Sequence, residues 1–368
     1  KKKNKAFNVS YWDLSYNKFS NFSNFSTIIE NSTKPIKYLN INGCDICDED
    51  TKMLFSSLES FQHVNKLKFL SIAGAAFDSN KSINAFKRFL KVCNLTYLDL
   101  GSISDVADVI TALEKVGIKT LKTLILRNTL LETRSLDDLK SIIDYSDNLA
   151  ELDISGTGLR IESISSIIEA INNNENIKKF SIKLNSLELH GNSLKSIIKY
   201  FLSNELDGDS DKSSSSPKSK RKSSKMKRST KKSYLRKWRS LSFASNGMEI
   251  DDLNKLIDLF EKMERLEMVY LDDNFDSSMV GVGDILCDLL RIDIPLMGIS
   301  LAGSKKHKLG DEMMTFLKDA SKSEILEYLN IENNDLGNGS IKTIENLLLN
   351  SKSLRTLKID HNSFTSIS

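Results

Sequence analysis

The chain has 368 residues, of which 40% are hydrophobic and 27% charged, and its net charge is +3. This apolar content can supply a core, but the length exceeds that of one compact layered domain, so we expect two domains or an elongated array. With 3 prolines, 16 glycines and no apolar run near the roughly 18 residues of a membrane-spanning helix, the composition argues against collagen-like, low-complexity and transmembrane classes.

Four cysteines, Cys44, Cys47, Cys93 and Cys287, are too few for a disulfide framework in a chain of this length. We expect free thiols and a cytoplasmic protein. The sequence does not begin with Met and stops inside a motif, so we also expect it to be a piece of something larger.

A repeat runs through the whole chain with the pattern L-x-x-L-x-L-x-x-N/C-x-L. Twelve copies occur, and most of them start 26 to 31 residues apart. In the seventh copy two registers compete, one starting at Ile177 and one at Leu184. The first positions of the twelve copies are Val9, Ile36, Leu67, Leu95, Leu121, Leu149, Ile177, Trp238, Leu266, Leu296, Leu326 and Leu354.

The alternating L-x-L segment of each copy predicts a short strand with its leucines turned inward. Helical spacing of apolar residues at 163–171, 252–263 and 342–349 predicts a helix as the return path. Strand, turn and helix fit 28 to 30 residues, so we expect an α/β solenoid, a horseshoe with about twelve parallel strands on its concave face and helices on its convex face. Residues 1–204 form its N-terminal part, 205–233 an insert, and 234–368 its C-terminal part, truncated after an apolar edge at Leu354, Leu357, Ile359 and Phe364.

These repeats resemble the ribonuclease-inhibitor-like class of leucine-rich repeat proteins, outside the insert. Residues 12–19 and 151–159 also resemble the repeat domain of the CARMIL family, actin-regulatory scaffolds that bind capping protein, which implies a cytoskeletal role. The capping-protein-binding segment of that family lies in a tail beyond the repeats and is absent here. Ran GTPase-activating proteins share the repeat class, which keeps a GTPase-activating role as an alternative, although their acidic tail is absent too.

Enzymatic motifs are missing from the sequence. Cys44 and Cys47 have zinc-knuckle spacing but no second ligand pair, and Cys44 occupies the ninth repeat position, where a turn role is usual. The four histidines lie in different repeats, and no phosphate-binding loop occurs. We therefore expect no catalytic residue, metal, cofactor or small-molecule substrate.

Positions 3 and 5 of each repeat should point outward on the concave face. Position 3 holds Tyr11, Tyr38, Phe69 and Tyr97 in the first four repeats, which we call the aromatic column. Because aromatic rings beside polar groups are typical of interface centres, we expect a protein partner there. The predicted partner-binding set comprises the column with Asp13, Asp99, Arg127 and Asp153.

The insert belongs to a strongly basic region. Between Lys212 and Arg239 there are thirteen Lys or Arg and no acidic residue, which leaves a charge of −10 on the rest of the chain. We expect a disordered, solvated loop with a regulatory role, and a dedicated binding site for an anionic membrane or an acidic protein is the alternative. The loop would permit nuclear shuttling, and it has no aromatic residues for sequence-specific nucleic-acid recognition. Its predicted anion-binding residues are Lys218, Lys220, Arg221, Lys222, Lys225, Lys227 and Arg228.

Serines near these bases, Ser223, Ser229 and Ser242, are candidate phosphorylation sites. The segment 239–243 resembles the docking motif read by protein phosphatase 1, although Leu241 and Phe243 occupy inward repeat positions. The sequence favours a non-enzymatic protein–protein interaction platform of a larger intracellular scaffold. A GTPase-activating protein and an adaptor that targets a phosphatase or a membrane are the alternatives.

Overall fold

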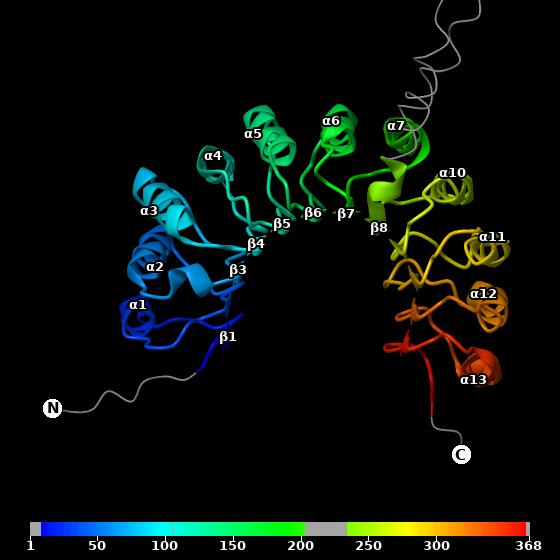
Figure 1. Cartoon of the computed structure of the whole chain (residues 1–368). Helices are drawn as coiled ribbons and strands as arrows, with labels where there is room; N and C mark the ends of the chain where they lie inside the picture. The colour runs from blue at the N-terminus through cyan, green and yellow to red at the C-terminus, as the bar shows by residue number, and fades with distance from the viewer. Residues whose placement is uncertain (1–8, 105, 203–233, 366–368) are drawn as a thin grey trace, which may run out of the picture. The chain divides into compact units, whose positions relative to one another are not determined.

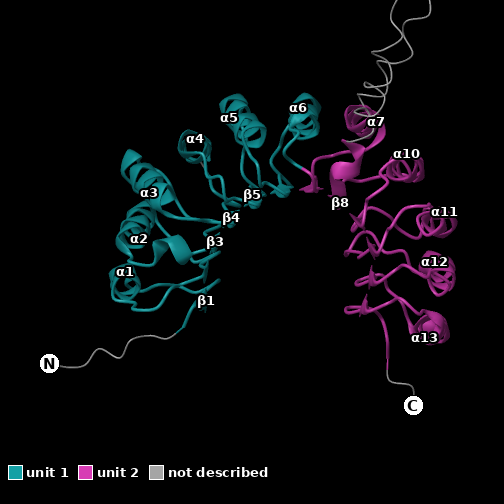
Figure 2. Cartoon of the chain, viewed as in Figure 1, with its two compact units in different colours: residues 1–177 teal, residues 178–368 magenta. Residues whose placement is uncertain are grey.

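The computed structural model describes residues 9–104, 106–202 and 234–365. The chain divides into two compact units, residues 1–177 (unit 1) and 178–368 (unit 2) (Figure 2). The predicted basic residues of the insert, with Ser223 and Ser229, lie outside the described residues.

Unit 1 repeats a strand followed by a helix six times. Its strands are β1 (Tyr11–Asp13), β2 (Tyr38–Asn40), β3 (Phe69–Ser71), β4 (Tyr97–Asp99), β5 (Thr123–Ile125) and β6 (Glu151–Asp153). Its helices are α1 (Phe22–Glu30), α2 (Asp48–Ser60), α3 (Asn80–Val92), α4 (Ala107–Val116), α5 (Thr133–Asp144) and α6 (Ile161–Asn173), with a short 3-10 turn η1 (Val64–Lys66).

Unit 2 continues the same order. Its strands are β7 (Phe180–Lys183), β8 (Trp238–Ser242), β9 (Met268–Tyr270), β10 (Gly298–Ser300), β11 (Tyr328–Asn330) and β12 (Thr356–Lys358). Its helices are α7 (Gly191–Phe201), α10 (Ile250–Phe260), α11 (Val282–Asp288), α12 (Glu312–Ala320) and α13 (Ile341–Asn350), with 3-10 turns η2 (Leu235–Lys237) and η3 (Asn338–Ser340).

The strands follow one another in chain order from β1 to β12, and every pairing within either unit is parallel. In each unit the strands line the inner side and the helices cover the outer side (Figure 1). The described residues thus form a leucine-rich repeat solenoid of strand-and-helix repeats, which confirms the predicted fold class.

The core consists of the inward residues of the strands and the apolar faces of the helices. Leu39, Leu70 and Leu98, the fourth positions of three repeats, are completely buried. The eighth position of most repeats adopts a left-handed backbone, as at Asn128 (φ 56°) and Asp273 (φ 55°). Gly156 satisfies this requirement in the sixth repeat, where a Cβ would lie 2.4 Å from the Asn128 side-chain oxygen. A side chain at Gly156 would therefore displace the Asn128 side chain and adopt a backbone conformation that glycine takes without strain.

The seventh repeat differs from both predicted registers. Ile182 pairs with Leu241 and the amide of Leu184 donates to the carbonyl of Ser242, so these two residues take the fourth and sixth repeat positions. An irregularity between Phe180 and Ser181 shifts the chain. Asn185 is consequently at position 7, not at position 9 as the sequence suggested.

Two further expectations can be compared with the structure. Helix α10 runs from Ile250 to Phe260, so the predicted end at residue 263 is three residues too late. The apolar edge of the last repeat is present: Ile359 and Phe364 line an open surface with Leu348 and Leu349. No helix in the described residues is long and apolar enough to cross a membrane.

Candidate partner-binding surface

The aromatic column forms a continuous stack across four strands of unit 1. Tyr11, Tyr38, Phe69 and Tyr97 are register partners on β1 to β4. Their successive ring centroids lie 3.8, 3.9 and 4.0 Å apart, with interplanar angles of 11° to 14°. The parallel register thus brings residues 27 to 31 positions apart in the sequence into direct contact.

Stacking determines what the column can offer a partner. Each inner ring has both faces covered by its neighbours, so Tyr38 and Phe69 present their edges and, for Tyr38, a hydroxyl. Tyr11, at the end of the column, is 59% exposed. Ring edges carry partial positive charge, which suits the carbonyl oxygens and ring faces of a partner.

The hydroxyls of Tyr38 and Tyr97 remain protonated donors at neutral pH. Burial raises the pKa of Tyr97 to about 12, and the nearby Asp99 carboxylate acts in the same direction. The pKa of Tyr38 is also raised, by burial and by its hydrogen bond with Tyr11.

The carboxylates beside the column have different exposures. Asp13 is exposed; hydrogen bonds from the side chain and backbone of Ser15 lower its pKa, and the Asn40 amide donates to it at 3.1 Å. Asp99 and Asp153 are buried, and their Oδ1 atoms accept the amide hydrogens of Gly101 and Ser155 at 3.0 Å. Asp99 and Asp153 are therefore less accessible to a partner than Asp13, because both carboxylates accept amide hydrogens of the turn that follows their strands.

Arg127 is the half-buried cation of this surface. Its Nη2 lies 3.1 Å from Oδ2 of Asp99. A Cβ on Gly101 would be 3.0 Å from the Arg127 Cγ, so a glycine here leaves room for the arginine stem. Arg127 therefore has a fixed position beside the end of the column.

Tyr16, in the turn that follows β1, was not predicted. It has φ 58° and is largely exposed, and the Asn42 amide donates to its hydroxyl at 3.4 Å. Its ring packs over Gly43, where a Cβ would come within 2.7 Å of a ring carbon. Gly43, at the equivalent turn position of the next repeat, was the sequence feature that could have indicated this packing of Tyr16.

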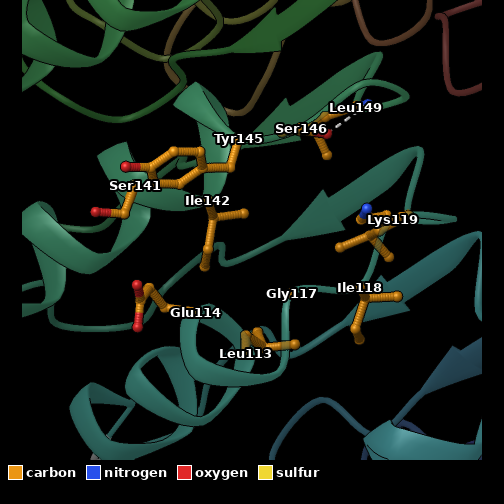
Figure 3. A pocket seen from close by; sticks show the side chains of 11 residues that line it. Leu113, Glu114, Gly117, Ile118, Lys119, Ser141, Ile142, Tyr145, Ser146 and Leu149 are labelled. Carbon is orange, nitrogen blue, oxygen red and sulfur yellow. Dashed lines mark hydrogen bonds between the residues drawn. The ribbon is translucent and has the colours of Figure 1, made fainter.

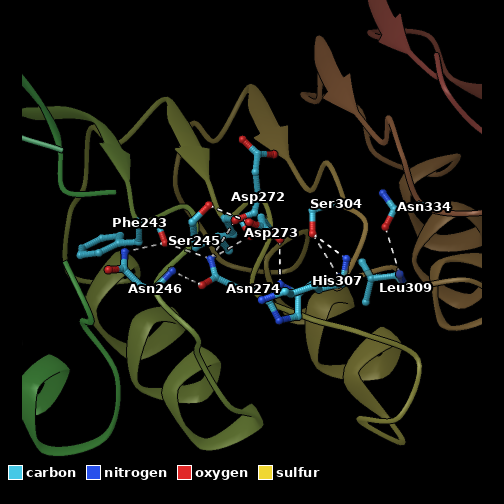
Figure 4. A network of polar contacts seen from close by, with 12 residues as sticks. Phe243, Ser245, Asn246, Asp272, Asp273, Asn274, Ser304, His307, Leu309 and Asn334 are labelled. Carbon is cyan, nitrogen blue, oxygen red and sulfur yellow. Dashed lines mark hydrogen bonds and ion pairs between the residues drawn. The ribbon is translucent and has the colours of Figure 1, made fainter. Parts of the chain in front are cut away.

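Unit 2 carries a polar network at its turns (Figure 4). Asp273 Oδ1 lies 2.7 Å from Nδ1 of His307, and Ser245 donates to the other carboxylate oxygen at 2.9 Å. Burial tends to raise the pKa of Asp273, but hydrogen bonds from Ser304, His307 and Ser245 outweigh it and lower the pKa. This network joins three successive repeats and is fully accounted for by turn structure.

A small apolar pocket lies between the ends of α4 and α5 (Figure 3). Leu113, Ile118 and Ile142 line it, and Lys119 and Tyr145 stand at its border. Its lining contains no cluster of groups suited to catalysis.

Cys44 and Cys47 have the spacing of metal ligands in the sequence. The Cys44 thiol donates to the carbonyl of Leu14 at 3.0 Å, which is a turn contact, while Cys47 is exposed at the start of α2. No group of three potential metal ligands occurs in the described ranges.

Ser242 is buried on β8 and donates to Asn185 at 2.6 Å, so a kinase cannot reach it in the folded chain. Leu241 and Phe243 are completely buried, so a phosphatase cannot bind these two side chains in the folded chain.

Comparisons with known proteins give one curated relative. The Rho GTPase-activating protein gacW of Dictyostelium discoideum is 21% identical over 348 residues, which cover 92% of this chain and 28% of that protein. The chain therefore spans less than a third of its relative. No family model matches the chain.

Two solved structures are similar in part. The leucine-rich repeat protein LegL7 of Legionella pneumophila is 17% identical, with a TM-score of 0.49 over 83% of this chain and 86% of that one. TLR13, from its complex with ssRNA13, is 12% identical, with a TM-score of 0.47 over 98% of this chain and 50% of that one.

Proposed function

We propose that the chain is a protein-binding platform whose partner covers the aromatic column of unit 1. The observation that carries this proposal is the stack of four rings on successive strands, held on the side of the sheet that the helices leave open. Repeat solenoids use such extended inner surfaces for binding. A larger intracellular scaffold of cytoskeletal type is the setting we propose for it.

The column suits a binding role because its rings are already ordered. Aromatic residues at interface centres commonly cost about 2 kcal/mol or more of binding energy when truncated, and rigid side chains lose little entropy on association. Exposed Asp13 and the half-buried Arg127 provide polar groups at the border of the rings.

Affinity capture with the double variant Tyr38→Ala, Phe69→Ala tests the proposal. We expect the proteins retained by the wild-type chain to be lost. Both substitutions remove every stacking contact of the column, and at roughly 0.5–1.5 kcal/mol for each aromatic pair the fold should lose about 2 to 4 kcal/mol. Circular dichroism and a melting curve must therefore show that the variant is folded.

Tyr11→Ala is the milder variant, because it breaks one stacking contact at the exposed end of the column. Tyr145→Ala is the matched control, since Tyr145 is an exposed tyrosine outside the column. Retention of the same proteins by the folded double variant would refute the proposal.

GTPase activation is a second candidate, favoured by the similarity to gacW, which is named a Rho GTPase-activating protein. Turnover of GTP by purified Rho-class and Ran-class GTPases, measured with and without this chain, tests it directly. No acceleration by the folded chain would leave the binding platform as the function. Targeting through the basic insert is a separate proposal, and vesicle binding by a variant of the insert tests it.

A further inference from the structure

The two ends of the strands in unit 1 differ in charge. Because the strands are parallel, the segments that lead from a helix into the next strand all lie on one flank of the unit. Four of these five segments, 31–37, 61–68, 91–96 and 115–122, contain eight lysines and neither an acidic residue nor an arginine, whereas the fifth, 145–150, contains Asp147 and no lysine. All eight lysines are exposed, and none forms an ion pair among the described residues. We call these four segments the lysine flank.

Backbone hydrogen bonds hold the lysine flank in a fixed arrangement. The residue before each strand repeats as Lys37, Lys68, Thr96 and Lys122. The amide of Lys68 donates to the carbonyl of Lys37 at 2.9 Å, and Thr96 and Lys122 continue the ladder at 2.8 Å each. Three of the eight lysines therefore start from this ladder, Lys37 and Lys68 on adjacent rungs and Lys122 one rung beyond Thr96.

The same position in unit 2 provides an internal comparison. There the ladder runs through Arg239, Glu267, Met297, Glu327 and Arg355, with amide-to-carbonyl distances of 2.7 to 2.9 Å. Arg239 pairs with Glu267 at 3.2 Å and Arg355 with Glu327 at 3.3 Å. Unit 2 thus pairs opposite charges at this position, whereas unit 1 places Lys37 beside Lys68, and neither side chain forms an ion pair with its described neighbours on the ladder.

Two carboxylates at the C-terminal ends of α1 and α2 have partners outside the lysine flank. Glu59 pairs with Arg88 at 2.8 Å, and Glu30 accepts a hydrogen bond from Ser57 at 2.8 Å. Lysines near helix C-termini also complement the helix dipole, but that effect accounts for the lysines near a helix end and not for the row beside the strands.

The choice of lysine indicates the kind of partner. Lysine is depleted at protein–protein interfaces, and arginine is the side chain that recognises phosphates and bases bidentately. A row of strongly hydrated point charges instead suits the diffuse attraction of an anionic bilayer. Val92, 43% exposed, and Tyr145, 83% exposed, lie at helix ends on the same flank, where aliphatic and tyrosine side chains can enter the headgroup layer.

We propose that the lysine flank of unit 1 docks on an anionic lipid bilayer. This inference is independent of the protein partner proposed for the aromatic column. It also assigns membrane contact to a part of the folded solenoid and not to the basic insert.

Co-sedimentation of the full chain with vesicles tests the inference, using phosphatidylcholine with phosphatidylserine against phosphatidylcholine alone. The flank variant combines Lys37→Gln, Lys68→Gln and Lys122→Gln. We expect its partition coefficient on the anionic vesicles to fall about a hundredfold, since each lysine near the surface contributes about fivefold. Binding of the wild-type chain should weaken as salt is added.

The control variant combines Lys262→Gln, Lys342→Gln and Lys352→Gln, three exposed lysines of unit 2 that make the same change in net charge. It should stay within about threefold of the wild type, because these three lysines lie outside the lysine flank. A third variant replaces the seven predicted bases of the insert with Gln. All variants should melt like the wild type, because exposed lysines contribute little to folding.

Three results would overturn the inference. The wild-type chain could fail to bind anionic vesicles, or the flank variant could bind them as well as the control variant does. The flank could also bind heparin in preference to vesicles, which would identify a soluble polyanion as its ligand. Loss of vesicle binding in the insert variant alone would assign membrane contact to the insert.

Discussion

The Nη2 atom of Arg127 lies 3.1 Å from Oδ2 of Asp99, and Asp99 is only 2% exposed. The same Oδ2 accepts a hydrogen bond from Ser71 Oγ at 3.0 Å, and Oδ1 accepts one from the amide of Gly101 at 3.0 Å. One carboxylate thus links three neighbouring repeats.

Replacing Asp99 with Ala should destabilise the chain by about 3 kcal/mol, because it leaves the Ser71 hydroxyl, the Gly101 amide and Arg127 without their acceptor. Asp99→Asn should cost about 1 kcal/mol, since an amide oxygen still accepts two of these bonds. Urea unfolding measures both values. Asp13→Ala, at the equivalent but exposed position of β1, should cost well under 1 kcal/mol. Equal losses for Asp13 and Asp99 would contradict the structural role of Asp99.

Asp272→Asn should stabilise the chain at neutral pH by about 0.5–1 kcal/mol. Burial raises the pKa of Asp272, and the charges of Glu332 and Asp273 raise it further. Hydrogen bonds from Ser300 and Ala302 lower this pKa but do not cancel the rise. An amide can make the same bonds: Asn185 accepts from Ser242 at 2.6 Å and Ala244 at 2.8 Å, as Asp272 does from Ser300 at 2.5 Å and Ala302 at 2.7 Å.

The sign follows from linkage. A carboxyl with a raised folded-state pKa contributes stability below its unfolded value, near 3.8, and loses that contribution as pH rises through the folded pKa. The advantage of the Asp272→Asn variant should therefore be present at pH 7 and shrink as pH falls toward about 3. Unfolding free energies across this range measure it. A constant difference would show that titration of Asp272 does not contribute.

Two nearby leucines of α13 should respond differently to truncation. Leu347 is completely buried, so Leu347→Ala should cost about 2 to 5 kcal/mol. Leu349 is 74% exposed at the apolar edge of the last repeat, so Leu349→Ala should change the unfolding free energy by less than about 0.5 kcal/mol. Chemical denaturation of both variants provides the measurement, and a large loss at Leu349 would mean that another segment covers this edge.

The strands and the aromatic column were predictable because both follow from alternation. Once L-x-L is recognised as a strand with inward leucines, position 3 must face outward, and parallel register stacks it on its neighbours. The seventh repeat was not predictable in the same way. Leucines and isoleucines fit several registers there, and the irregularity at Phe180 has no signal in the pattern.

The sequence pattern also failed to predict the burial of Asp99 and Asp153 and the positive charge of the lysine flank. An outward strand position does not reveal that Asp99 will turn into the following loop, because two of its hydrogen-bond donors come from other repeats. The lysines of the flank are spread over several repeats, with Lys37 and Lys68 separated by 31 residues, so a search for contiguous charge runs finds the insert and misses them.

The ninth repeat position supplies the final prediction, because its asparagines join the turns of successive repeats (Figure 4). Asn246 is buried, and its Nδ2 donates to the carbonyls of Leu184 and Phe243 at 2.9 Å each. Its Oδ1 accepts the amides of Leu187 and Leu189 at 2.9 and 3.1 Å. Removing this side chain takes the partner from the Leu184 carbonyl and from the amides of Leu187 and Leu189, while the Phe243 carbonyl keeps the Asn274 amide at 2.9 Å.

We expect Asn246→Ala to cost about 3 to 5 kcal/mol in urea unfolding, since each unsatisfied buried group costs about 1 kcal/mol or more. Asn362→Ala is the matched control. Its side chain makes equivalent bonds to Ile331, Ile359, Asn334 and Leu336, but it belongs to the partly exposed last repeat, where water can replace the lost partner. Its loss should be about 1 to 2 kcal/mol. Hydrogen exchange should accelerate at Leu187 and Leu189 in the Asn246→Ala variant, and equal losses in the two variants would show that burial does not set the cost.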